Sequence, residues 1–91
     1  MKEMKIVKRD GHIVDYSPDK IEEAIKKANL EVDEDDQASG TQIRNIIKYI
    51  EGLKKKRMLV EDIQDIIEQK LMEFDKYELA KKYITYRYTR E

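Results

Sequence analysis

The sequence predicts a mostly helical α+β fold, in which an N-terminal β-hairpin covers a bundle of four helices. Two short β-rich runs near the N-terminus are joined by Asp10-Gly11, a strong hairpin signal. Isoleucine and leucine then recur at helical spacing over most of the remaining chain. The 91 residues allow one compact core at most, so we expect residues 1–91 to form a single domain.

The hairpin is predicted over residues 4–16. Asp-Gly is typical of a two-residue type I′ turn, because that turn needs positive φ at both central positions. Such a turn would place Val7 opposite Val14 and Lys8 opposite Ile13. An isolated hairpin is marginally stable in water, so it must pack on the helices and cover part of their core.

Four helices are predicted from the spacing of apolar residues, over residues 18–29, 37–55, 61–74 and 77–90. Ser17 and Pro18 begin the first helix as its N-cap and its first helical residue. The acidic stretch 31–36 is interpreted as a solvated loop or as the negative first turn of the second helix, whose start Gly40 obscures. The basic run 54–57 suits the C-terminal end of that helix, where positive charge meets the helix dipole.

Composition limits the functions that this domain can have. Charged residues make up 43% of the chain, yet 19 Lys+Arg against 20 Asp+Glu leave a formal net charge of -1. This balance disfavours direct binding of nucleic acid. The absence of cysteine excludes disulfides, thiolate zinc sites and cysteine nucleophiles. No apolar run suits a membrane span and no signal-peptide pattern opens the sequence, so a cytoplasmic domain without membrane contact is expected.

The residues offer no support for catalysis. Three glycines are too few for a phosphate-binding glycine loop, and the two common nucleotide-binding glycine motifs are absent. His12 is the single histidine, which leaves histidine-based metal sites and Ser-His-Asp catalysis without supporting residues. We therefore expect no catalytic residue, no protein-held metal and no enzymatic activity in this chain.

One group of cations favours ligand binding. Lys8 and Arg9 end the first predicted strand, and Lys20 lies in the first turn of the first helix. The N–H groups and dipole of that helix end already favour an anion such as phosphate. A polyphosphate site is one interpretation, whereas spacing alone favours three surface cations among nineteen. Strict alternation also sets Lys8 and Arg9 on opposite faces of the strand.

Four ordered blocks of residues carry a resemblance to a known family. They are the run 6–11, which contains Lys-Arg-Asp-Gly, and the runs 17–21, 60–66 and 77–87. Together they resemble the ATP-cone domain, which occurs at the N-terminus of many ribonucleotide reductases and in NrdR-type repressors of their genes. The opening and closing blocks are most similar to those of anaerobic or B12-type reductases.

The resemblance implies an allosteric domain that binds ATP or dATP, with Mg²⁺ accompanying the triphosphate, and that controls the overall activity of a ribonucleotide reductase. It implies a catalytic domain or subunit of the reductase as partner, and a homo-oligomer. Position by position, it implies that the triphosphate contacts Lys8, Arg9 and Lys20. It also implies that the adenine is bordered by Ile6, Val7, Ile21 and Val60, and that Arg87 or Arg90 adds charge.

Two alternatives of other classes stay open. A NrdR-like transcriptional regulator would use the same nucleotide-sensing module, but its zinc-bearing DNA-binding part would lie outside this cysteine-free chain. A nucleotide-independent helical interaction module would leave the cations as ordinary surface residues. The start at Met1 and the abrupt end at Glu91 are interpreted as the bounds of an N-terminal fragment of a longer protein.

Overall fold

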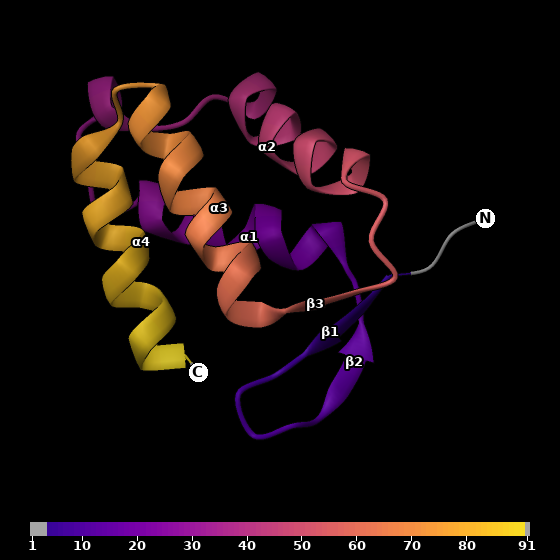
Figure 1. Ribbon diagram of the computed structural model, residues 1–91. Coiled ribbons are helices and arrows are strands. Elements are labelled where there is room, and N and C mark those ends of the chain that lie inside the picture. Colours follow the sequence, from indigo (N-terminus) through magenta and orange to yellow (C-terminus); the bar gives the residue numbers. More distant parts are fainter. Residues whose placement is uncertain (1–3, 91) are drawn as a thin grey trace.

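The computed structural model describes residues 4–90, and the side chains of residues 4–85. Its elements in chain order are β1 (Lys5–Val7), β2 (Ile13–Asp15), α1 (Pro18–Asn29), the 3-10 helix η1 (Glu34–Asp36), α2 (Gly40–Gly52), β3 (Arg57–Leu59), α3 (Val60–Glu73) and α4 (Tyr77–Arg90). The strands lie together at one end of the four α-helices (Figure 1). The predicted mostly helical α+β class is therefore confirmed.

The sheet contains one strand more than the predicted hairpin. β3 pairs in parallel with β1, joining residues 57–59 to residues 5–7, and the strand order is β2-β1-β3. The interpretation of residues 54–57 as a helix end is wrong, because α2 ends at Gly52. Lys54 then adopts a left-handed φ of 55°, which ends the helical path before the chain enters the sheet.

The register of the hairpin differs by one residue from the prediction. Ile6 pairs with Val14 and Val7 pairs with Ile13, whereas a two-residue turn would have set Val7 against Val14. Because side chains alternate along a strand, Ile6 and Lys8 lie on the face toward the helices and Val7 lies on the outer face. The observed register adds Val14 to the inner face and Ile13 to the outer face.

The turn of the hairpin explains this register. It has three residues rather than two, and the Lys8 N–H donates to the carbonyl of His12 across its base. Only Gly11 in the turn has a positive φ, of 93°. Asp10 keeps an ordinary backbone and accepts a hydrogen bond from the His12 N–H, at 3.0 Å. A three-residue turn with glycine in the left-handed position is the next common hairpin connection.

A capping box sets the start of α2. The Ser39 hydroxyl accepts a hydrogen bond from the Gln42 N–H at 3.1 Å, and the Gln42 side chain accepts one from the Ser39 N–H at 3.0 Å. Two free donors at the helix end are thus satisfied. The helix begins at Gly40 rather than at the predicted residue 37.

The acidic stretch between α1 and α2 is a loop containing η1, and not the first turn of α2. Asn29 holds the end of this loop, because its side-chain amide donates to the Ala38 carbonyl and accepts from the Ala38 N–H. The Lys76 ammonium group donates to the Asp35 carbonyl at 2.8 Å, which ties the loop to the start of α4.

The core lies between the four helices. Its largest fully buried side chains are Ile25, Ile46, Ile50, Ile67, Leu71 and Leu79. Each such side chain contributes about 1.5–3 kcal/mol by leaving water. Ile6 and Met58 add buried side chains from the inner face of the sheet, so the sheet is anchored to the same core. Among the described residues, no helix combines the length and apolar character needed to cross a membrane.

Candidate functional site

A cavity of about 300 Å³ lies between the inner face of the sheet and the helices α1, α3 and α4. Its walls come from segments far apart in the chain, so the cavity exists only in the folded domain. Its volume is at the lower end of the range for pockets that hold small molecules.

The polar part of the cavity is built by the end of β1 and the first turn of α1. Lys8 follows β1 on the inner face, and Lys20 lies one turn into α1. Ser17, the N-cap residue of α1, makes no side-chain hydrogen bond to the helix. Pro18 has no N–H group, and the Lys20 N–H donates to the Ser17 carbonyl at 3.2 Å. The two cations and the positive end of the helix dipole therefore favour an anionic group here.

The apolar part of the cavity is built mainly by α3. Val60, Ile63 and Ile67 contribute aliphatic side chains, and Ile21 adds one from α1. Gln64 lies among them with its side chain only 6% exposed. A primary amide carries both donor and acceptor groups, so Gln64 adds a polar group to an otherwise apolar wall.

Five residues predicted for the site line the same cavity, although they come from three separate segments. These are Ile6, Lys8, Lys20, Ile21 and Val60. The structure therefore brings together both an apolar and a cationic subset of the predicted residues.

The other predicted residues lie elsewhere. Val7 is on the outer face of the sheet, where it lines a second hollow. Arg9 lies in the hairpin turn, with its Nε 3.5 Å from Oε2 of Glu61 in α3. The side chains of Arg87 and Arg90 lie outside the described residues, and only their place on α4 is defined.

The lining residues that the sequence did not predict include Gln64, Tyr16 and Tyr83. A signal for Gln64 was present, because it is a glutamine beside Ile63 and Ile67 in the apolar stripe of α3. The two tyrosines carry no such signal, since the same spacing is typical of ordinary core packing.

Tyr16 links the cavity to α2. Its hydroxyl donates to Oε2 of Glu51 at 3.0 Å. Burial, and next the hydrogen bond to the Glu51 carboxylate, raise the pKa of Tyr16 well above its ordinary value of 10.0. Tyr16 therefore stays a neutral donor and holds one wall of the cavity against the end of α2.

The carboxylates of the cavity wall are Asp15 and Glu23. Asp15 forms an ion pair with Lys5, which lies beside it on β1. Glu23 is exposed on α1, close in sequence to Lys20. The wall thus combines cations, carboxylates and an amide, a donor set that suits a ligand with both phosphate and hydroxyl groups.

Comparison of the sequence with known proteins identifies the family of this chain. Residues 4–91 match the family model of the ATP cone domain. The chain is 35% identical over 98 residues to the ribonucleoside-diphosphate reductase subunit alpha of Chlamydia trachomatis serovar D, covering 96% of this chain and 9% of that protein. It is 39% identical over 89 residues to the vitamin B12-dependent ribonucleoside-diphosphate reductase of Thermoplasma acidophilum, covering 91% of this chain and 11% of that protein.

A third relative is the ribonucleoside-diphosphate reductase subunit alpha of Chlamydia muridarum, at 33% identity over 98 residues, covering 96% of this chain and 9% of that protein. The chain spans about a tenth of the length of these curated relatives. Since the family model extends over almost every residue, this chain belongs to the ATP-cone domain family.

Proposed function

We propose that this chain is a regulatory domain that binds ATP or dATP in the cavity between the sheet and the helices, and that it controls the overall activity of a ribonucleotide reductase. The observation that carries the proposal is the division of the cavity, with Lys8 and Lys20 beside the α1 N-terminus and a buried amide among aliphatic side chains. Polyphosphate and purine are the two parts of a ligand that would match these two environments.

The triphosphate would lie at the polar part. Lys8 and Lys20 would contribute charge-assisted hydrogen bonds, and the N-terminus of α1 would add the favourable end of the helix dipole. Arg9 stands next to Lys8 in sequence and would join them after leaving Glu61. Mg²⁺ would be held chiefly by phosphate oxygens, with Glu23 as the nearest carboxylate candidate in the wall.

The adenine would lie against α3. Ile21, Val60 and Ile63 offer an aliphatic surface, and the Gln64 amide offers a donor and an acceptor to the polar edge of the base. Glutamine pairs with adenine through such bidentate contacts in other recognition sites. At that edge guanine presents two acceptors, O6 and N7, and the amide can pair with only one of them, so we expect the amide to favour adenine.

Regulation requires contacts that differ between two states of the domain, since an effector shifts an equilibrium only by its differential affinity. ATP and dATP differ by one ribose 2′-hydroxyl. Ser17 and Glu23 are the polar wall residues nearest in sequence to Lys20, and they are our candidates for that hydroxyl. The partner would be the catalytic domain or subunit of a cytoplasmic reductase, and the chain itself would contribute no catalytic residue.

Calorimetric titration with ATP, dATP and GTP tests the proposal. We expect ATP and dATP to bind and to raise the melting temperature, because a ligand at 100 times its Kd stabilises the folded state by about 2.7 kcal/mol. GTP should bind more weakly. Absence of both heat and thermal stabilisation at millimolar ATP and dATP would instead indicate a nucleotide-independent interaction module.

A further inference from the structure

A side chain of the cavity wall is hydrogen-bonded to the end of α2. Of the described residues that line the cavity, none belongs to α2 itself. Tyr16 lines the cavity, and its hydroxyl donates to Oε2 of Glu51 in the last turn of α2. The backbone of Tyr16 is held in place, because its N–H donates to the Met4 carbonyl at 2.9 Å. A change in the surroundings of the Tyr16 ring therefore reaches α2 through the hydroxyl.

The last turn of α2 contains residues that disfavour a helix end. Glu51 places a carboxylate at the negative end of the helix dipole. Gly52 is the last helical residue, and glycine is less favourable in a helix than every residue except proline. Its φ is not positive, and no described atom beyond its chain neighbours and the helix backbone lies within 4 Å of the place of a Cβ. The geometry does not require glycine here, so the turn is built to open easily.

The end of α1 has the opposite choice of residues. Lys26 and Lys27 lie in its last turn, where their charge suits the negative end of the dipole. In the described helix α2 no basic residue lies in the last turn, and the basic run 54–57 begins only after the helix has ended. The hydrogen bond from Tyr16 gives a physical reason for a carboxylate at this unfavourable position.

We propose that a ligand in the cavity orders the last turn of α2 through the hydrogen bond between Tyr16 and Glu51. A ligand beside the half-buried Tyr16 ring excludes water, and a hydrogen bond to a carboxylate is stronger where water is excluded. The turn then opens less often, because opening must break a stronger bond. This inference rests on the proposed function, and it names the segment whose order an effector changes.

The last turn of α2 also fixes the segment that leads into the sheet. Lys54 follows the helix with its left-handed φ of 55°, and the Lys56 carbonyl accepts a hydrogen bond from the Lys5 N–H at 2.9 Å. Residues 53–55 thus lie between two fixed points, the turn and the sheet. The basic run 54–57 is exposed along its whole length, so occupancy of the cavity would alter the order of this surface segment.

Hydrogen exchange at single amides tests the inference, with calorimetry on the same samples to measure binding. The reporters are the N–H groups of Leu53 and Lys54, which donate to the carbonyls of Ile50 and Glu51 at 3.2 Å. Saturating ATP or dATP should slow their exchange about two- to tenfold, which is the effect of one net hydrogen bond.

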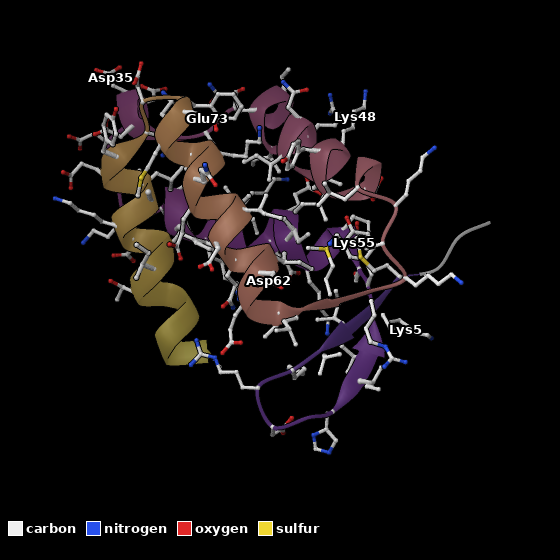
Figure 2. All side chains as sticks on the ribbon, in the orientation of Figure 1. Lys5, Asp35, Lys48, Lys55, Asp62 and Glu73 are labelled. Carbon is white, nitrogen blue, oxygen red and sulfur yellow. The ribbon has the colours of Figure 1, made fainter. Side chains whose placement is uncertain are left out.

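The end of α1 is the control within the same molecule. The Leu30 N–H donates to the Lys27 carbonyl at 3.2 Å, so it reports the opening of a similar turn. Leu30 precedes the loop that contains Asp35, and Figure 2 shows Asp35 at the far side of the molecule from Lys5 and Lys55. Its exchange should be the same with and without nucleotide.

Two substitutions of Glu51 separate the hydrogen bond from the charge. Glu51→Ala and Glu51→Gln both remove the carboxylate, and Glu51 is not a residue of the cavity wall. Glutamine keeps an oxygen that accepts from Tyr16, whereas alanine does not. Nucleotide should therefore slow the exchange of Leu53 and Lys54 in Glu51→Gln but not in Glu51→Ala. Equal slowing in the wild type and Glu51→Ala would overturn the inference.

Tyr16→Phe without nucleotide gives an independent test. The ring stays in the cavity wall and the hydroxyl is lost, so Leu53 and Lys54 should exchange about two- to tenfold faster than in the wild type. Unchanged exchange would contradict the role of the hydrogen bond. Nucleotide binding to the wild type without slower exchange at these amides would overturn this inference alone. Absence of binding would overturn the proposed function and this inference with it.

Discussion

Arg9 in the hairpin turn pairs with Glu61 in the first turn of α3, with 3.5 Å between Nε and Oε2. Both residues are next in sequence to residues that line the cavity, Lys8 and Val60. The pair therefore joins the sheet to α3 beside the proposed phosphate region. Both side chains are substantially exposed, and such pairs contribute about 0.2–1 kcal/mol, so a triphosphate can displace Glu61 at small cost.

Glu61→Gln should strengthen ATP binding, because the substitution frees Arg9 for the phosphates. The gain is limited to the energy of the exposed pair, which corresponds to about two- to fivefold in Kd. Calorimetric titration measures it. Asp62→Asn makes the same charge change one residue away, on the side of the second hollow, and should leave the affinity unchanged. Equal effects from both variants would show that Arg9 has no special part.

Lys20→Ala should weaken ATP and dATP binding by about 1.5–3 kcal/mol, because a charge-assisted contact to phosphate is lost. The melting temperature without nucleotide should stay near the wild-type value, since Lys20 is exposed. Lys27→Ala, in the last turn of the same helix, is the control. An unchanged Kd for Lys20→Ala would remove this residue from the site.

Gln64→Leu should reduce the preference for ATP over GTP. The aliphatic side chain keeps the volume and the burial but cannot pair with the polar edge of a base. Competition titrations of the two nucleotides give the ratio of their Kd values. Gln69→Leu, on an exposed position of α3, should leave that ratio as in the wild type. If Gln64→Leu keeps the full preference for ATP over GTP, residues other than Gln64 distinguish the two bases.

Tyr16→Phe should flatten the dependence of stability on alkaline pH. The pKa of Tyr16 is raised in the folded state, so the protonated hydroxyl contributes its full stabilisation below the unfolded value of about 10.0. That contribution declines as the pH rises above this value toward the higher folded pKa. Urea unfolding from pH 8 to about 11 measures the effect. Tyr77→Phe is the control on an exposed ring, and parallel curves for wild type and Tyr16→Phe would contradict the prediction.

Lys54→Gly should stabilise the domain by about 0.5–1 kcal/mol, because glycine adopts the left-handed φ of 55° without steric cost. Denaturant unfolding measures the difference. Lys55→Gly removes the same charge at a neighbouring position without positive φ, so it should destabilise the domain instead. The same sign for both variants would mean that the backbone at residue 54 is not strained.

Local sequence signals found most of the elements. Apolar spacing located the helices, and the hairpin rests on a sound turn signal. The Ser39 and Gln42 pair was readable as a capping box and marks the true start of α2. β3 could not be predicted, because it has only three residues and contains Arg57. It also depends on pairing with β1, at residues 5–7. Pairing over such a separation leaves no local pattern.

The hairpin turn limited how much of the candidate site could be predicted from the sequence. Asp-Gly is compatible with a two-residue and a three-residue connection, and the choice decides which face each strand residue occupies. The three-residue turn brought Val14 to the face of Ile6 and Ile13 to the face of Val7, and it placed Arg9 in the turn itself. The predicted positions of Lys20 and Ile21 did not depend on the turn length, because the N-cap of α1 fixes their place on the helix. Gln64 could be noticed as a glutamine beside the apolar stripe of α3, but its place in the cavity wall depends on the elements packed opposite that helix.

The parallel pairing of β1 with β3 also has a consequence for the order of folding. We expect residues 5–7 to meet residues 57–59 only after α1 and α2 have formed between them, since closing so long a loop has an entropic cost that those helices reduce by packing. The binding cavity takes walls from both sides of that closure, at Lys8 and at Val60. We therefore expect the site to form late, so that a chain arrested before the strands join would have most of its helices and no affinity for effector.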